Sequence, residues 1–192
     1  YTGSVMAIDP SGRGKDETAY AVVKMLHGQL FVTKAGGLSG GYDDQTLQKL
    51  CDIAKEEKVN LVLIESNFGD GMFTKMITPF FMRTHKVTIE EIRHSQQKEK
   101  RIVDTLEPVL NQHRLIIDQY VIDRDYASTQ HLPPESALRY QLFYQMSRIT
   151  RERGSLAHDD RLDVLSMAVG YWVEQMSKDV EMAMQDRKTH LM

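Results

Sequence analysis

Residues 3–38, GSVMAIDPSGRGKDETAYAVVKMLHGQLFVTKAGGL, contain three apolar runs separated by two turn signals. The first run, residues 3–9, ends at Asp9, where the proline and the glycines that follow predict a turn. The later apolar residues divide at His27 and Gly28 into two runs that are typical of neighbouring strands. The stretch therefore predicts a three-stranded meander at the start of the chain.

The remaining sequence alternates predicted strands and helices. Short apolar runs predict further strands at residues 59–66, 86–92 and 114–118. Helical periodicity predicts helices at residues 43–58, 69–85 and 96–113, a broken helical segment at 119–153 and a last helix from about His158 to Ser177. This order predicts an α/β fold in which a central mixed β-sheet is flanked by helices. We expect residues 1–178 to form this domain and residues 179–192 to form a C-terminal tail, which is either a surface helix or frayed.

Composition excludes several classes of protein. The chain of 192 residues has a formal net charge of -3, so any DNA contact must come from local basic patches. The single cysteine, Cys51, cannot form an intrachain disulfide, and its helical neighbours predict a buried side chain. No apolar run approaches the roughly 20 residues that span a membrane, and we expect no membrane contact. The chain begins with Tyr1 rather than Met, which indicates a piece of a longer polypeptide.

Acidic residues occur where the predicted elements end or begin. Asp9 ends the first strand, Glu65 ends a later strand, and Asp160 and Asp163 share one face at the start of the last helix. Ligands of open α/β sheets gather at the carboxyl ends of strands, so these acids are expected to meet there. An apolar stripe can pack the last helix on the sheet and bring its acids to the same place; it comprises Leu162, Leu165, Val169, Trp172 and Met176.

Such a cluster of carboxylates is unfavourable unless protons or cations compensate its charge. Carboxylate oxygens without paired histidines or cysteines favour Mg²⁺ or Mn²⁺, and two such ions suit phosphodiester hydrolysis. Taken singly, each acid has an ordinary alternative. An isolated Asp after a strand, such as Asp9, is usually a turn former, while Asp159 is equally explained as a helix cap, and Asp160 and Asp163 as a solvated helix face. His158 is more often a polar boundary residue than a group that orients a carboxylate or water.

Basic residues flank these acids in the sequence. The loop DPSGRGKDET lacks the spacing of a phosphate-binding loop, but Arg13 and Lys15 could contact a DNA backbone. The stretch RHSQQKEKR offers Lys98, Lys100 and Arg101 for the same role, and RITRER at residues 148–153 is a second basic stretch. Both stretches are also compatible with an ordinary solvated helix surface.

Three stretches, VMAIDPSGRGKDETAYAVV, LVLIESNFGDG and HDDRLDVLSMA, together resemble the nuclease domain of the large terminase subunit of tailed bacteriophages. The resemblance is to the short-tailed branch and spans nearly the whole chain. It implies an RNase H-like fold, related to Holliday-junction resolvases. It also implies a metal-dependent endonuclease that cleaves double-stranded concatemeric viral DNA during genome packaging by a two-metal mechanism.

The resemblance also implies roles for individual acids. Asp9 would bridge two Mg²⁺ or Mn²⁺ ions, Glu65 would hold one of them and Asp160 would close the site, which makes these three the implied catalytic residues. Asp163 would be a further metal ligand one helical turn on, and Asp16 matches an additional acid of some family members. The choice among Asp159, Asp160 and Asp163 stays open.

The resemblance further implies partners and a location. The partners would be double-stranded DNA, an ATPase motor domain of the same polypeptide, a portal protein and a small terminase subunit. The location would be the host cytoplasm, at the viral procapsid. The sequence contains no phosphate-binding loop, so we expect no ATP hydrolysis. Two alternatives remain: a junction-resolving nuclease of the same fold, and a docking module that binds DNA or the portal without cutting.

Overall fold

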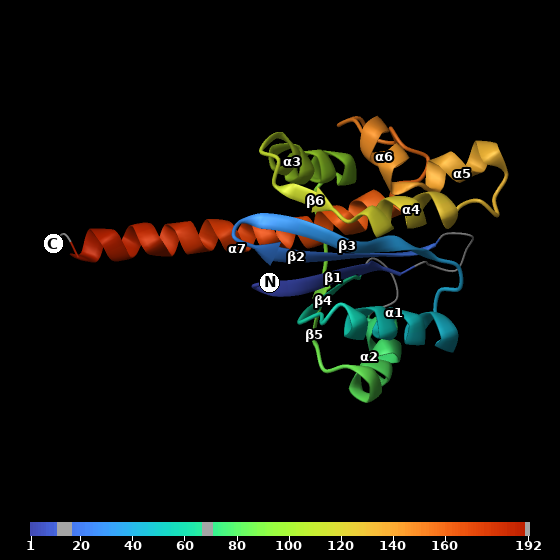
Figure 1. The fold of residues 1–192 in the computed structure, drawn as a ribbon, viewed down its shortest axis with the longest axis horizontal. Helices are drawn as coiled ribbons and strands as arrows, with labels where there is room; N and C mark the ends of the chain where they lie inside the picture. Colours follow the sequence, from blue (N-terminus) through green and yellow to red (C-terminus); the bar gives the residue numbers. More distant parts are fainter. Residues whose placement is uncertain (11–16, 67–70, 191–192) are drawn as a thin grey trace.

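The computed structural model describes residues 1–10, 17–66 and 71–190. Its centre is a mixed six-stranded sheet with the strand order β5-β4-β1-β2-β3-β6 (Figure 1). The strands are β1 (Gly3–Asp9), β2 (Thr18–Leu26), β3 (Gln29–Leu38), β4 (Leu61–Glu65), β5 (Thr88–Ile92) and β6 (Leu115–Ile117). The first three strands form the predicted antiparallel meander, and β4, β5 and β6 each pair in parallel with a neighbour.

Helices cover both faces of the sheet, as predicted. One face is covered by α1 (Asp44–Glu56) and α2 (Met72–Thr84). On the other side lie α3 (Lys98–Asn111), α4 (Gln119–Ala127), α5 (Pro134–Tyr140), α6 (Leu142–Arg148) and α7 (Asp160–His190) (Figure 1). The three short helices α4, α5 and α6 correspond to the broken helical segment expected at 119–153. Cys51 is buried in the α1 face, as predicted.

Alternation along the strands decides which face each acid meets. In β1, Met6 and Ile8 pack with α1 and α2, whereas Val5 and Ala7 pack with α7. Successive side chains point to opposite faces, so Asp9 falls on the α7 side. The same alternation in β4 puts Glu65 on that side too, because Leu61 and Leu63 belong to the α7 cluster. Since β1 and β4 are parallel, the two acids leave the sheet at the same edge and face.

Helix α7 crosses the sheet and then projects beyond it (Figure 1). Its apolar stripe packs against β1, β2 and β3 and is buried except for Met176, which is partly buried. The indole nitrogen of Trp172 donates a hydrogen bond of 2.9 Å to the Val23 carbonyl. The helix continues past the expected end near Ser177 to His190, because its later residues are mostly good helix formers and include a Glu174–Lys178 ion pair one turn apart. The boundary expected at residue 178 therefore falls inside one continuous helix, whose residues 177–190 are exposed.

None of the helices in residues 1–10, 17–66 and 71–190 is long and apolar enough to cross a membrane.

Candidate metal centre

Three carboxylates converge where β1, β4 and α7 meet. Asp9, Glu65 and Asp163 each offer one oxygen, and these oxygens lie within 4.8 Å of one another. Glu65 is 4% exposed and Asp163 is 0% exposed. The sheet fixes the first two acids, and the docking of α7 on the sheet brings in the third. The structure thus unites acids that are far apart in the sequence.

Several oxygens of this cluster have no hydrogen-bond partner. Both carboxylate oxygens of Asp163 and Oε2 of Glu65 are buried without accepting a hydrogen bond from any described residue. Leaving a buried carboxylate oxygen unsatisfied costs about 1–3 kcal/mol or more. Hard divalent cations bind such oxygens directly. The donor set therefore fits a hard divalent cation.

Mutual repulsion in the cluster is visible at Asp9. Burial, followed by the nearby charges of Glu65 and Asp160, raises the pKa of Asp9 from 3.8 to about 8. At neutral pH this carboxyl group favours its protonated form unless a cation compensates the negative charge. The position is consequently suited to exchange a proton for a metal ion.

Two cations of α3 lie against the acids. Nζ of Lys98 is 3.0 Å from Oδ1 of Asp159 and 3.2 Å from Oδ2 of Asp163. Nη1 of Arg101 is 2.8 Å from Oδ1 of Asp163, in an ion pair whose angles do not form a hydrogen bond. Burial acts to lower the pKa of Lys98, but Asp163 and Asp159 outweigh it, so the net pKa is raised. Lys98 is therefore held as a charged counter-ion.

These contacts refine the expected DNA-binding set. Lys98 and Arg101, predicted to meet phosphates, lie on the acid cluster, whereas Lys100 is exposed on α3. Arg13, Lys15 and the acid Asp16 fall outside the described residues. A DNA contact by any of the five basic residues stays a prediction.

The remaining residues at the start of α7 border the cluster. Asp160 is partly exposed, and its Oδ1 lies 4.0 Å from Nζ of Lys98. The Asp159 carbonyl accepts a 2.8 Å hydrogen bond from the Asp163 amide, so Asp159 occupies the capping position, while its side chain bonds to Lys98. The ring of His158 stacks on Tyr140, with centroids 4.1 Å apart. The structure thus groups Asp163 with Asp9 and Glu65 and leaves Asp160 at the rim.

A buried arginine that the sequence did not single out fixes this end of α7. Arg161 is 0% exposed and donates two hydrogen bonds to Glu17, at 3.0 and 2.8 Å. It also donates to Asp125 at 3.0 Å and to Ser128 at 2.9 Å. Asp125 in turn accepts the amide N–H of Leu142 at the start of α6. The network joins α7 to α4, to α6 and to Glu17, the residue that precedes β2. Its one sequence signal is a charged residue within the apolar stretch of α7.

A second group that the sequence did not single out is His94, between β5 and α3. Its Nε2 is buried and has no partner among the described residues. Burial, followed by the charge of Arg101, lowers its pKa, so the neutral ring is favoured. A neutral imidazole beside the carboxylates adds no further positive charge to the centre.

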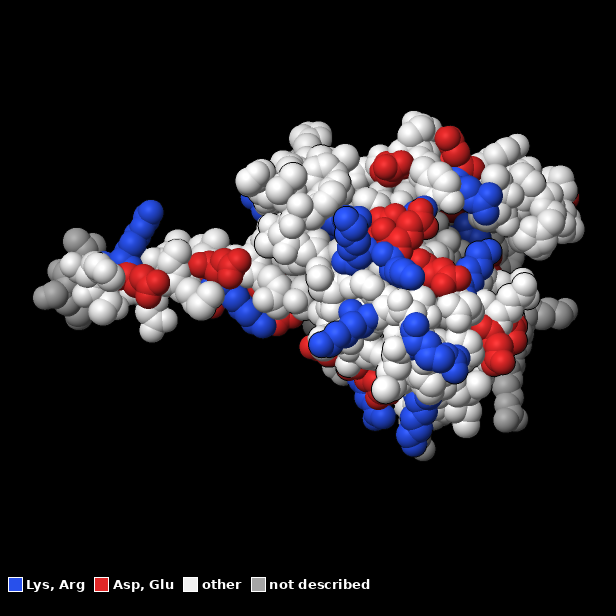
Figure 2. Space-filling model, turned by 60° about the horizontal axis from the view of Figure 1, so that its bottom comes forward, with Lys and Arg blue, Asp and Glu red and all other residues white. Residues whose placement is uncertain are grey.

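Charges of both signs share the surface of the domain. Figure 2 shows a central group of Asp and Glu side chains bordered by Lys and Arg on the visible face. No field of one sign covers this face, which agrees with the net charge of -3. Long-range attraction of DNA would therefore depend on local basic groups.

Comparisons with known proteins place these features in a family. The model of the ribonuclease H-like domain of the bacteriophage T7 terminase matches residues 8–115. The terminase large subunit of Enterobacteria phage T3 is 48% identical over 179 residues, which are 93% of this chain and 30% of that protein. The chain therefore spans under a third of the length of this relative.

Solved structures share the fold at low sequence identity. The nuclease domain of the large terminase subunit of bacterial virus Sf6 has a TM-score of 0.60 at 15% identity, covering 87% of each chain. The human cytomegalovirus terminase nuclease domain has a TM-score of 0.57 at 13% identity, covering 87% of this chain and 82% of that one. The expected RNase H-like fold is thus confirmed. By the family match and the T3 identity, the chain belongs to the family of ribonuclease H-like domains of bacteriophage T7 terminases.

Proposed function

We propose that this domain is a Mg²⁺- or Mn²⁺-dependent endonuclease that cuts double-stranded concatemeric viral DNA during genome packaging. The observation that carries the proposal is the cluster of Asp9, Glu65 and Asp163, in which one oxygen of each carboxylate lies within 4.8 Å of the others. Its support includes the shared fold of the Sf6 and cytomegalovirus nuclease domains, which were solved with calcium or manganese.

In this proposal the acids hold two ions. Two divalent ions, when bound, would hold the attacking and leaving oxygens of a phosphodiester in line. Asp9 and Glu65 are fixed by the sheet and Asp163 by α7, so their oxygens are positioned before any ligand arrives. Asp160, at the rim, is proposed to complete the site with a further oxygen. Lys98 and Arg101 offset part of the negative charge through their ion pairs with Asp163.

The phosphate backbone is proposed to pass over the start of α7. A hollow of about 320 Å³ lies there, lined by Arg139, Arg148, His158 and Tyr144 among others. The guanidinium of Arg148 lies over the Tyr144 ring, 5.6 Å from its centroid. With exposed Lys100, and with Arg13 and Lys15, these groups would contact phosphates on either side of the acids. Backbone contacts carry no base information directly, so sequence preference would be weak.

The proposed setting follows from the family. The chain corresponds to 30% of a terminase large subunit, which is consistent with an ATPase motor domain elsewhere in the same polypeptide. A portal protein and a small terminase subunit are the further proposed partners, in the host cytoplasm at the procapsid.

Plasmid cleavage tests the proposal. With Mg²⁺ or Mn²⁺ the domain should nick and linearise supercoiled plasmid, and EDTA should stop the reaction. Asp9→Asn, Glu65→Gln and Asp163→Asn should lose activity, while Asp179→Asn on the exposed part of α7 should retain it.

Two further measurements distinguish the proposed nuclease from a junction-resolving nuclease and from a docking module. A four-way junction cut much faster than linear duplex by a dimer would indicate a resolvase. DNA binding without metal-dependent cutting would indicate a docking module. If all three acid variants cut as well as the parent, the site assignment is wrong.

A further inference from the structure

The edge of β3 is only partly paired. Strand β6 pairs with β3 over Leu30–Val32, whereas β3 continues to Leu38. On the side away from β2, none of the described strands pairs with residues 34–38. An edge of this kind presents backbone N–H and C=O groups to any strand that can approach it.

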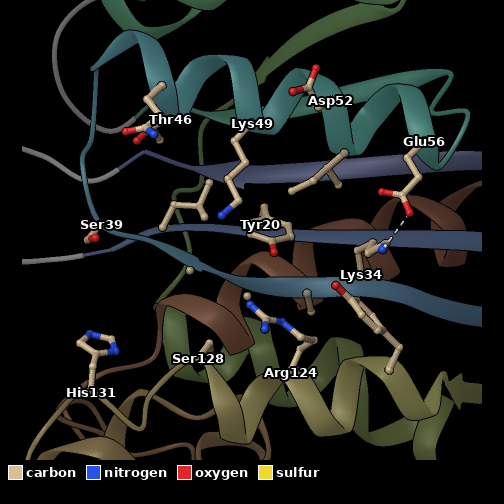
Figure 3. Close-up of a pocket in the computed structure, with 17 residues that line it drawn as sticks. Tyr20, Lys34, Ser39, Thr46, Lys49, Asp52, Glu56, Arg124, Ser128 and His131 are labelled. Atoms are coloured by element: carbon tan, nitrogen blue, oxygen red, sulfur yellow. Dashed lines mark hydrogen bonds and ion pairs between the residues drawn. The ribbon is translucent and has the colours of Figure 1, made fainter.

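Two helices turn this edge into a slot. A cavity of about 630 Å³ lies along β3 between α1 and α4 (Figure 3). Residues 34–39 of β3 and the following turn line it, together with one side of each helix. Five extended residues span about 16 Å, a length set by the rise of about 3.3 Å per residue. The flanking helices hinder a second sheet from reaching this edge, while a single extended segment fits between them.

Positive charge dominates inside the slot. Lys49 of α1 and Arg124 of α4 point into it from opposite sides (Figure 3). Neither forms an ion pair within the described part of the chain. Two acids also line the slot. Glu56 pairs there with Lys34 at 3.2 Å, and Asp52 accepts a hydrogen bond from Gln48 at 2.9 Å, so the three cations of the lining, Lys34, Lys49 and Arg124, outnumber the acids.

We propose that residues 34–38 of β3 accept an extended, acidic segment of a partner protein as an added strand. The backbone of β3 would supply the pairing hydrogen bonds, and Lys49 and Arg124 would bind carboxylates of the segment. Gly36 and Gly37 lie in the middle of this edge, and the side chains of Tyr20 and Glu17 pack over them on the face of the sheet, so the edge itself presents only backbone. Strand β2 lies between the slot on β3 and β1, whose Asp9 belongs to the acid cluster, so the added segment would pair at the far side of β3 from the metal centre.

Binding of synthetic peptides to the unmodified chain tests the proposal. The probe is a short, capped, fluorescent peptide in which valine alternates with glutamate, and the control peptide carries lysine in place of glutamate. The acidic peptide should bind in an anisotropy titration and slow amide hydrogen exchange at residues 34–38. Equal binding of the basic peptide, protection at another site or no binding of the acidic peptide would each overturn the proposal.

Substitutions separate the slot from general electrostatics. The double variant Lys49→Ala/Arg124→Ala should bind the acidic peptide about tenfold more weakly or worse, because two charge-assisted contacts are lost. Lys55→Ala, on an exposed position of α1 outside the slot, should bind like the parent. Plasmid cleavage should be unchanged in both. Unaltered peptide affinity in the double variant, or a loss of DNA affinity in place of peptide affinity, would overturn the proposal. Dimerisation of the chain through pairing of two β3 edges would also overturn the proposal.

Discussion

Nη1 of Arg101 lies 2.8 Å from Oδ1 of Asp163, yet the two atoms make no aligned hydrogen bond. The carboxylate is fully buried and electrostatically compensated, but both of its oxygens remain free of hydrogen bonds from the described residues. A purely structural buried acid would normally have its oxygens satisfied by donors. The geometry of this pair suits a metal ligand whose two oxygens remain available.

Asp163 should matter more for cleavage than Asp160. Asp163→Asn removes a buried ligand, so its loss of activity should exceed the roughly 10–100-fold typical of residues that only support a ligand. Asp160→Asn at the rim should stay within that range. Initial rates of plasmid cleavage, measured over a range of Mn²⁺ concentrations, compare the two. The reverse order would make Asp160 the principal ligand.

The metal-free domain should lose stability as the pH rises. The folded-state pKa of Asp9, about 8, lies above its ordinary value of 3.8, so the native state binds more protons between these values. The free energy of unfolding should therefore fall from about pH 4 to about pH 8 and level off above. Urea unfolding in EDTA at several pH values measures this. Asp9→Asn should remove this part of the slope, and parallel curves for parent and variant would contradict the assignment.

Lys98 should stabilise the domain mainly when metal is absent. Lys98→Met leaves Asp159 and Asp163 without their shared cation, and we expect a loss of about 1–2 kcal/mol, a value reduced because Lys98 is partly exposed. Mn²⁺ should raise the melting temperature of this variant more than that of the parent. Lys100→Met, on an exposed neighbouring position, should stay within about 0.5 kcal/mol of the parent. A Lys98 variant as stable as the Lys100 variant would argue against the counter-ion role.

Arg161 should be among the most sensitive positions in the fold. Arg161→Met leaves the acids Glu17 and Asp125 without their cationic partner. Breaking a buried ion pair in this way lowers the free energy of unfolding by about 3–5 kcal/mol. Equilibrium unfolding by denaturant measures the loss, with Arg187→Met on the exposed end of α7 as the control. A change below about 1 kcal/mol would show that the network adds little to stability.

Lys100 should contribute to DNA binding through phosphate alone. Lys100→Ala should reduce the slope of log affinity against log salt by about 1 and weaken binding to all sequences alike. Lys98 and Arg101 should change the slope less, because acids already hold them. Filter-binding titrations of duplex DNA at several salt concentrations give these slopes. An unchanged slope for Lys100→Ala would assign it to ordinary surface.

Local patterns in the sequence were sufficient to predict most of the architecture. The apolar runs ending at Asp9 and Glu65 gave two strands, and period-two alternation puts both acids on one face once the strands pair in parallel. The meander, the alternating helices and the role of α7 followed from similar patterns. The end of α7 was predicted near Ser177, and the tail was expected to be either a surface helix or frayed, because the exposed half of α7 has no apolar stripe that would mark it as part of the same helix.

Local sequence patterns could not predict the contacts between segments that are distant in the chain. Spacing puts Asp160 and Asp163 on one helical face, so it could not tell which of them is buried at the cluster. The sequence alone does not show whether a basic side chain contacts a phosphate or a carboxylate. For Lys98 and Arg101 the partner is decided by the packing of α3 on α7, which brings both side chains to the acids. The bonds from Arg161 to Glu17 join residues 144 positions apart, for which no local signal exists.

The contact between Trp172 and Val23 allows the docking of α7 on the sheet to be followed by intrinsic tryptophan fluorescence. The sequence has a single tryptophan, so its intrinsic fluorescence reports one event, the seating of α7 on β2. Circular dichroism instead averages over all helices, including the exposed half of α7. Comparing the two signals during unfolding would show whether the exposed C-terminal turns of α7 unfold before the helix separates from the sheet. If they do, Asp163 in the first turn keeps its place in the acid cluster while the C-terminal turns are unfolded.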